Sequence, residues 1–183
     1  MNTGKLIVIA GPSGVGKGTI VKKLLATDSK LALSISATTR SKREGEMNGR
    51  EYYFLSKEEF EQKIKDGKFA EYAQYAGNYY GTLCSTIDEI RATGKHLILE
   101  IEVQGAEQIK EKYPDAKLIF IMPPNLGELK KRLTERNTED EATIKLRLAQ
   151  VDREIAKSKI FDAKIVNDNL EIAILAVQEE IYS

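Results

Sequence analysis

Five short apolar runs, most of them separated by segments with helical spacing, dominate the hydrophobic pattern of this 183-residue chain. Runs of this length are typical of strands that are buried on both faces, and their alternation with helices favours a parallel sheet. The runs are Leu6–Ala10, Leu31–Ile35, Leu97–Ile101, Leu118–Met122 and Ala163–Val166. Helices are expected at Lys17–Ala26, Ser85–Thr93, Gly105–Lys112 and Leu170–Tyr182. The pattern predicts an α/β core with helices on both faces of the sheet and ligands at the carboxyl ends of its strands.

Residues 36–84 depart from this pattern. Short, half-exposed strands rich in tyrosine are expected there, among them Arg50–Phe54 and Phe69–Tyr75, the second with side chains alternating between two faces. Between them, Ser56 and Glu59 have the spacing of a capping box at the start of a helix. We therefore predict an inserted lobe of mixed α and β structure.

Residues 125–155 form the second departure and are highly charged. An apolar stripe of Leu126, Leu129 and Leu133 predicts one helix, and Thr138 begins a second. The apolar positions of this second helix are Ile144, Leu148, Val151 and Ile155. We predict a helical hairpin that closes as a lid, and assign residues 1–35, 85–124 and 156–183 to the core of a single domain.

Charge and cysteine content narrow the class of protein. The 28 basic and 28 acidic residues cancel, which argues against a general nucleic-acid or anionic-membrane surface. No apolar run approaches the ~18 residues that span a bilayer, and the first residues lack a signal-peptide pattern. With Cys84 as the only cysteine, neither an intrachain disulfide nor a zinc cluster is expected. The expected compartment is the cytoplasm, and the lone His96 is interpreted as a strand-edge residue.

A glycine-rich turn follows the first apolar run. Gly11, Gly16 and Lys17 fit the phosphate-loop pattern of a glycine, four residues and then Gly-Lys. The glycines allow backbone N–H groups to approach an anion, the following helix points its positive end at it, and Lys17 adds a full charge. This predicts a nucleoside triphosphate site. Its residues are Gly11, Pro12, Ser13, Gly14, Val15, Gly16, Lys17, Gly18 and Thr19.

The residue after Lys17 departs from the plain motif, which has Ser or Thr there. In this chain Gly18 takes that position and the hydroxyl follows on Thr19. The Gly-Lys-Gly-Thr ending resembles the nucleoside monophosphate kinases. Whether Thr19 would contact magnesium directly or through water stays open.

Residues 36–46 concentrate hydroxyl groups and cations, among them Ser36, Arg40 and Arg43. Two guanidinium groups with nearby hydroxyls suit a phosphate dianion. The alternative is a solvated charged loop beside a tyrosine-rich hairpin, and spacing alone leaves both open.

Longer motifs favour the first alternative. The pattern Ser36-x-Thr38-Thr39-Arg40-x-x-Arg43 resembles the signature of guanylate kinases, which phosphorylate GMP. Further motifs continue the resemblance in the family's order over essentially the whole chain. They are Phe69–Ala73, Gly77–Gly81, Glu102–Gly105, Arg136–Glu139 and Ile165–Asp168.

The resemblance implies a role for particular residues. The residues that would hold the GMP phosphate are Arg40, Arg43, Tyr52 and Tyr80. Those that would contact guanine are Ser36, Glu71, Thr82 and Glu102. The catalytic set would be Lys17, Arg40, Arg136 and Arg147, with Asn167 on the adenine side of ATP. The chain departs from the family's best-known members at Thr82, where they have serine, and at Glu100-Ile101-Glu102, where they have Asp-Ile-Asp.

Glu100 ends a buried strand that faces the phosphate loop, where triphosphate enzymes keep a carboxylate that organises magnesium. The alternative is a strand-end carboxylate exposed to water. Magnesium is the expected cofactor, bound mainly through phosphate oxygens and water, with Thr19 and Glu100 as candidate protein ligands.

The expected reaction is transfer of the γ-phosphate of ATP to GMP, with dGMP as a further acceptor, giving ADP and GDP. The GMP phosphate oxygen is already anionic, so no side-chain nucleophile is required, and positioning and charge neutralisation carry the reaction. Two alternatives are a kinase acting on AMP and a scaffold module of guanylate-kinase type that binds phosphorylated peptides. The intact phosphate loop and the lid arginines argue against the scaffold.

Overall fold

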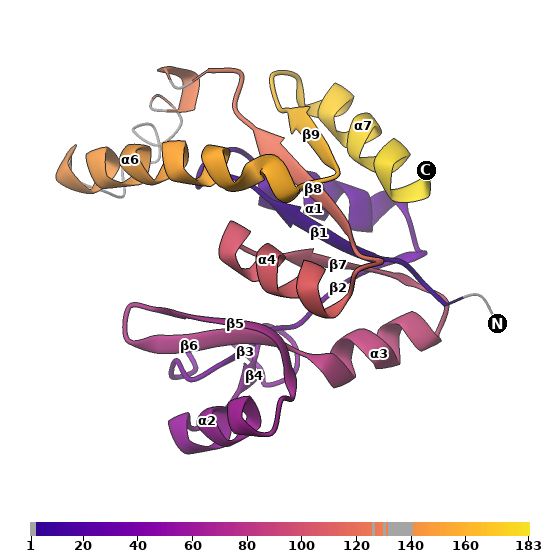
Figure 1. Ribbon diagram of the computed structural model, residues 1–183, viewed down its shortest axis with the longest axis vertical. Coiled ribbons are helices and arrows are strands. Elements are labelled where there is room, and N and C mark those ends of the chain that lie inside the picture. Colours follow the sequence, from indigo (N-terminus) through magenta and orange to yellow (C-terminus); the bar gives the residue numbers. More distant parts are fainter. Residues whose placement is uncertain (1–2, 126, 130, 132–140) are drawn as a thin grey trace.

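The computed structural model describes residues 3–125, 127–129, 131 and 141–183. Its larger sheet has five parallel strands in the order β2-β7-β1-β8-β9 (Figure 1). The strands are β1 (Leu6–Ala10), β2 (Leu31–Leu33), β7 (His96–Glu100), β8 (Lys117–Met122) and β9 (Ala163–Val166). The predicted parallel core is confirmed, with all five expected runs in it.

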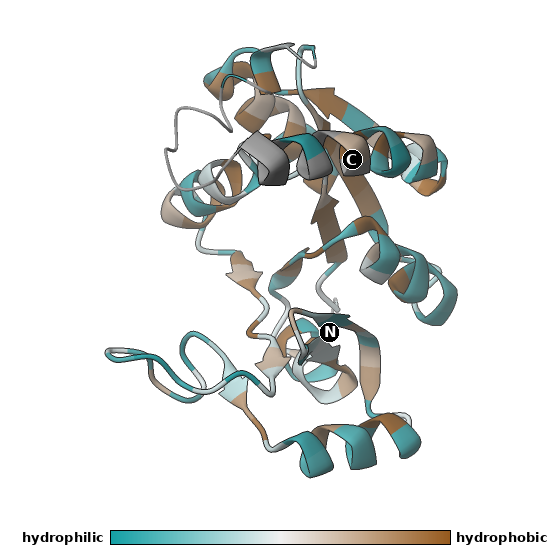
Figure 2. Ribbon diagram, turned by 90° about the vertical axis from the view of Figure 1, so that its left-hand side faces the viewer, coloured by the Kyte–Doolittle hydropathy of each residue, from teal (hydrophilic) through white to brown (hydrophobic). Residues whose placement is uncertain are grey.

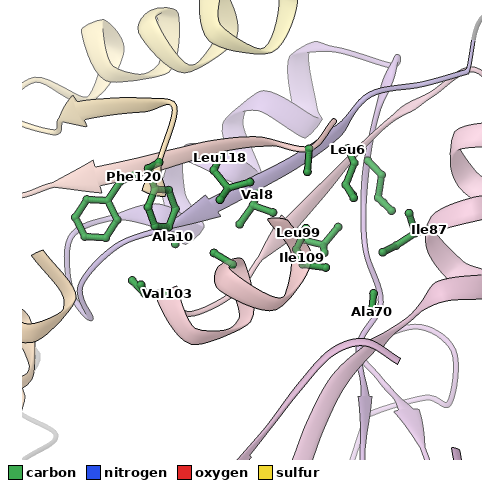
Figure 3. Close-up of a cluster of buried hydrophobic side chains, with 14 residues drawn as sticks. Leu6, Val8, Ala10, Ala70, Ile87, Leu99, Val103, Ile109, Leu118 and Phe120 are labelled. Carbon is green, nitrogen blue, oxygen red and sulfur yellow. The ribbon is translucent and has the colours of Figure 1, made fainter. Parts of the chain in front are cut away.

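Alternate side chains of these strands build two apolar layers, one on each face of the sheet. Leu6, Val8 and Ala10 of β1 point to one face, where they pack against helices α3 (Cys84–Ala92) and α4 (Val103–Lys112) (Figure 3). The opposite face is covered by α1 (Lys17–Thr27) and α7 (Leu170–Tyr182). Because both faces are buried, the strands are continuously apolar, and they are coloured predominantly hydrophobic in Figure 2.

Several predicted boundaries of the core elements were wrong by one or two residues. The strand expected at Leu31–Ile35 ends at Leu33, because the chain then leaves this sheet for the second one. β7 begins at His96, whose Nδ1 accepts a hydrogen bond of 2.9 Å from the Lys5 N–H. The strand-edge interpretation of His96 is thus confirmed. α4 begins at Val103, two residues earlier than expected, with Glu102 in extended conformation at its N-cap.

The second sheet is mixed and has the order β4-β3-β6-β5. Its strands are β3 (Ala37–Thr38), β4 (Tyr53–Phe54), β5 (Phe69–Tyr75) and β6 (Asn78–Leu83). Helix α2 (Lys57–Lys65) packs on it through Phe60, whose ring stacks on Phe69 at 4.1 Å between centroids. The predicted capping box of Ser56 and Glu59 is present. The strand expected at Arg50–Phe54 is shorter, because residues 49–51 form a turn.

A β-bulge interrupts the start of β5. The register with β6 shifts between Phe69 and Glu71, and Phe69, Ala70 and Glu71 are all buried. The expected alternation of side chains is therefore wrong at this end of the strand. Ala70 belongs to the core cluster beside α4 (Figure 3), so β5 joins the second sheet to the parallel core.

The predicted lid falls largely on residues outside those that the structure describes, among them Leu126, Leu133, Arg136 and Thr138. Its described residues are 125, 127–129, 131 and helix α6 (Glu141–Lys157), which is followed by a short 3₁₀ helix at Ser158–Ile160. Leu129 and Val151 form a small buried cluster, and Ile155 packs both against it and against the core cluster beside α4. Closure of this segment stays a prediction. None of the helices in the described ranges is long and apolar enough to cross a membrane.

Candidate active site

The phosphate loop connects β1 to α1 and requires glycine at two of its positions. Gly11 has a φ of 147°, and a Cβ there would lie 2.3 Å from the Ile121 carbonyl oxygen of β8. Gly16 has a φ of 101° at the N-cap of α1, and a Cβ there would lie 2.5 Å from Nδ2 of Asn167. Both the backbone conformation and the close neighbours exclude a side chain.

Lys17 lies folded along this loop. Its Nζ donates to the Gly11 carbonyl and, at 3.1 Å, to the Pro12 carbonyl. It lines a cavity of about 780 Å³, which we call the donor cavity. The lining residues are Ser13, Gly14, Gly16, Lys17, Gly18, Thr19, Lys22, Lys23, Ala26 and Glu100. Gly11, Pro12 and Val15, also expected at the triphosphate site, are buried and do not line this cavity. Lys22 and Lys23, which sequence reasoning did not assign, follow on α1 and add positive charge.

Glu100 lies opposite the phosphate loop at the carboxyl end of β7, as expected. It is exposed, and a Cβ on Gly18 would lie 3.5 Å from its Oε1. Thr19 lines the same cavity. Within the described ranges no group of three or more His, Cys, Asp or Glu side chains could hold a metal ion. Thr19 and Glu100 nevertheless present a hydroxyl and a carboxylate oxygen to the donor cavity, and hard oxygen ligands of this kind fit a magnesium ion whose other ligands are phosphate oxygens and water.

Asn167 braces the phosphate loop. Its side chain is buried, and Nδ2 donates a hydrogen bond of 2.9 Å to the Val15 carbonyl. The resemblance assigned this residue to the adenine side of ATP. The structure adds a second role, because the same amide links the end of β9 to the loop 152 residues earlier.

A second cavity, of about 300 Å³, lies between the two sheets, and we call it the acceptor cavity. Five of the residues expected to bind GMP line it, namely Ser36, Tyr52, Glu71, Tyr80 and Glu102. The other lining residues are Ala73, Gln74, Tyr75, Gly81, Glu100, Ile101, Gln104 and Gly105. Thr82 is buried and lines an adjoining space of about 340 Å³, which shares Ser36, Tyr52, Glu100 and Ile101 with the acceptor cavity.

Glu71 is the buried carboxylate of the acceptor cavity, with 5% of its surface exposed. Its Oε1 accepts a hydrogen bond of 2.7 Å from the Thr82 hydroxyl. Its Oε2 faces Gly105, where a Cβ would lie only 2.9 Å away. Burial raises the pKa of Glu71 above its usual range; the Thr82 hydrogen bonds oppose this shift, and the negative charge of Glu102 reinforces it.

Arg40 does not line the acceptor cavity but lies beside Tyr52, which does, and is held there by a carboxylate. Its guanidinium forms a bidentate pair with Glu46, at 3.1 and 2.7 Å, and lies 5.3 Å from the centre of the Tyr52 ring. The Arg40 hydrogen bonds keep the pKa of Glu46 below its usual range. The Arg43 backbone N–H also donates to Glu46, at 2.8 Å, while the Arg43 side chain is exposed. Sequence reasoning gave Glu46 no role, although it stands three residues from Arg43.

Tyr52 and Tyr80 stand edge to face, with ring centres 6.1 Å apart. Arg40, Tyr52 and Tyr80 therefore lie together, as the resemblance implies. Arg43 approaches them through its backbone contact with Glu46 alone.

Helix α6 contributes a carboxyl group that sequence reasoning missed. Oε2 of Glu154 is buried and has no hydrogen-bond partner among the described residues. Burial raises the pKa of Glu154; the positive charge of Lys17 opposes this shift, and Glu102 adds to it. No local pattern could reveal this position. Arg136 and the side chain of Arg147 lie outside the part of the chain that the structure describes.

A phosphate loop at the end of the first strand, with a second cavity beside it on an inserted sheet, defines the class of P-loop nucleoside monophosphate kinases. Residues 3–183 match the family model described as guanylate kinase. The chain belongs to the guanylate kinase family.

Individual guanylate kinases match this chain over all or nearly all of its length. The chain is 48% identical over 183 residues to a guanylate kinase of Synechococcus elongatus, with 100% of both chains covered. It is 52% identical over 171 residues to one of Synechocystis, covering 93% of this chain and 90% of that one. Among solved structures, guanylate kinase from Anaplasma phagocytophilum matches with a TM-score of 0.75 at 31% identity, covering 99% of this chain and 86% of that one.

Proposed function

We propose that the protein transfers the γ-phosphate of ATP to GMP, giving ADP and GDP. The observation that carries this proposal is that Glu100 lines both the donor and the acceptor cavity. Two adjoining cavities, one on a phosphate loop and one on a base-reading carboxylate, suit direct transfer between two bound nucleotides. The family membership supports the same reaction.

The donor cavity would hold the triphosphate of ATP. Backbone N–H groups of the loop and the amino end of α1 would face its β- and γ-phosphates. Lys17 would exchange its contacts with the Gly11 and Pro12 carbonyls for phosphate oxygens. Thr19 and Glu100 would hold a magnesium ion, which would supply charge neutralisation at the phosphates.

The acceptor cavity would hold GMP. Guanine presents N1–H and the N2 amino group side by side, and the Glu71 carboxylate can accept from both. At the other end the GMP phosphate would take the place of Glu46 on Arg40, with the hydroxyls of Tyr52 and Tyr80 beside it. Arg43, which is exposed, would turn toward the phosphate.

The proposed phosphoryl transfer requires no side-chain base. An anionic oxygen of GMP attacks the γ-phosphorus in line, and the bond from that phosphorus to the ADP oxygen breaks. Lys17, together with Arg136 and Arg147 on lid closure, would stabilise the charge of the transferring group. With a single cysteine in the chain, we propose that this takes place in the reducing cytoplasm.

A coupled assay for ADP formation tests the proposal, with ATP and magnesium and with GMP, dGMP, AMP, CMP and UMP offered in turn. The expected result is turnover with GMP, with dGMP as a further acceptor, and AMP behind by orders of magnitude. AMP as the preferred acceptor would indicate the alternative kinase. Absence of ADP formation with every acceptor, with tight binding of a phosphopeptide, would indicate the scaffold class.

The argument for the enzyme over the scaffold rests on particular residues. The loop glycines, Lys17 and the Glu71–Thr82 pair are all in place.

A further inference from the structure

We propose that Gln108 and Lys112, on one face of α4, are positioning residues that hold Glu71 where it reads the guanine of GMP. This inference rests on the proposed function and goes beyond it, because neither residue lines the donor or the acceptor cavity. Both act on the backbone of β5, the strand that carries Glu71.

The contacts are four hydrogen bonds between α4 and the segment at the start of β5. The Tyr72 N–H donates to Oε1 of Gln108 at 3.1 Å, and Nε2 of Gln108 donates to the Tyr72 carbonyl at 3.0 Å. Nζ of Lys112 donates to the Phe69 carbonyl at 3.0 Å and to the Gly67 carbonyl at 3.1 Å. Gln108 and Lys112 are four residues apart and therefore share one helix face.

These contacts fall on the open edge of the second sheet. β5 is the last strand in the order β4-β3-β6-β5, so its outer backbone groups have no neighbouring strand. A glutamine amide offers one acceptor and one donor side by side, and here it satisfies both the N–H and the carbonyl of Tyr72 as another strand would.

The β-bulge makes this support necessary at Glu71. The register with β6 shifts between Phe69 and Glu71, so the ladder on the inner edge of β5 is interrupted immediately before the carboxylate. Lys112 holds the backbone two residues before Glu71, and Gln108 holds it one residue after. Ala70, packed into the core cluster on the same side, completes the restraint (Figure 3).

The same helix also shapes the opposite wall of the acceptor cavity. Glu102 at the N-cap of α4 and Gly105 in its first turn both line the cavity, and Gly105 approaches Oε2 of Glu71. Helix α4 lies between the parallel sheet and the β5–β6 hairpin (Figure 1). One rigid element therefore sets the spacing between Glu71 and Glu102, and Gln108 and Lys112 are its attachment to β5.

The test replaces Gln108 and Lys112 by methionine, singly and together, in the full chain. Methionine keeps side-chain length and helix propensity but lacks these donors and acceptors. We expect the double variant to raise both the Kd for GMP, measured calorimetrically without ATP, and the KM for GMP by at least about fivefold. The KM for ATP should stay within about twofold, and the GMP/AMP ratio of kcat/KM should fall, because Glu71 is no longer held in register.

Two controls separate positioning from simple anchoring. Lys112→Arg keeps a donor at the same place and should retain most of the GMP affinity, and Glu111→Ala changes an exposed neighbour on α4 and should bind GMP as wild type.

Unchanged GMP affinity in the folded double variant would overturn the inference. So would a parallel rise of both KM values with a lowered Tm, which indicates a structural anchor. If the double variant fails to fold, the single variants decide by the same criteria. Failure of the proposed function is recognised separately, as absence of GMP-dependent ADP formation by the wild type.

Discussion

The donor and acceptor cavities are built in opposite ways. The donor cavity comes almost entirely from one continuous segment, residues 13–26, and its ligand would meet backbone N–H groups and lysines. The acceptor cavity gathers side chains from the residues just before β3 and β4, from β5 and β6, from the end of β7 and from α4, including a buried carboxylate. A site made of backbone recognises phosphate of any nucleotide, whereas a site made of placed side chains can recognise one base. Substitutions should therefore affect turnover in the first cavity and selectivity in the second.

The largest effect is expected from Lys17→Met. This change removes the charge at the end of the loop and keeps the aliphatic chain, so kcat should fall by roughly 10²-fold. Steady-state kinetics with circular dichroism check it. Lys23→Met, a lysine lining the same cavity further along α1, is the matched control and should lose far less. A Lys17 variant that keeps more than about a tenth of the turnover would contradict the role of Lys17.

Arg40→Ala is expected to act on the acceptor side alone. Loss of the guanidinium that Glu46 now holds should raise the KM for GMP by at least about tenfold and change the KM for ATP little. Initial-rate kinetics with each substrate varied in turn measure this. Lys42→Ala, a change of an exposed cation two residues away, should leave both KM values within about twofold. Equal rises of the two KM values in Arg40→Ala would remove the distinction between the cavities.

Gly105→Ala tests the close approach of α4 to the base-reading carboxylate. The added Cβ would lie 2.9 Å from Oε2 of Glu71, so the carboxylate or the helix must shift. We expect a severalfold rise in the KM for GMP without loss of the fold, to be measured by kinetics and thermal unfolding. Gly77→Ala, at the tip of the β5–β6 hairpin with open space around it, controls for loss of a glycine, although its φ of 80° costs some stability. Wild-type GMP kinetics in Gly105→Ala would mean that Glu71 tolerates displacement.

The smallest effect is expected in the pH profile of Thr82→Val. Glu71 must be ionised to accept from guanine, so kcat/KM for GMP should fall as the pH drops through the raised pKa of Glu71. The Thr82 hydrogen bond favours the ionised form. Its loss therefore raises this pKa further and moves the acid limb to higher pH. Thr82→Ser keeps the hydroxyl and should leave the limb in place. The GMP phosphate titrates identically in all three proteins, so a limb that does not move in Thr82→Val would exclude control by Glu71.

The contrast between the cavities also explains what the sequence could predict. The phosphate loop and the five core strands carry local signals, because each is a continuous segment with a glycine pattern or an apolar run. The acceptor residues were assigned through the family resemblance, since Ser36 and Glu102 lie 66 positions apart and no spacing links them.

Other features of the structure have no signal in the nearby sequence. The two-residue strand β3 is too short for a periodic pattern, and the bulge at Ala70 broke the alternation expected for β5. Gln108 acts on Tyr72, 36 residues away, and a glutamine within a helical pattern carries no sign of such a contact. β2 ends two residues early because the chain leaves for the second sheet, and α4 begins two residues early at Val103 without a side-chain cap from Glu102, so no capping signal marks its start.

The central claim is that Glu71 reads the base while the phosphate loop carries the transfer, and Glu71→Gln tests it most directly. Glutamine keeps the size of the side chain but presents a donor where guanine needs two acceptors, and a buried unpaired group costs about 1–3 kcal/mol. The measurement is kcat/KM for GMP and for AMP in wild type and variant, at one pH and with ATP saturating. We predict that the GMP/AMP ratio falls at least about tenfold, equivalent to ~1.4 kcal/mol, while the KM for ATP is retained. An unchanged GMP/AMP ratio would contradict base recognition by Glu71 and would make Glu102 the residue that reads the base.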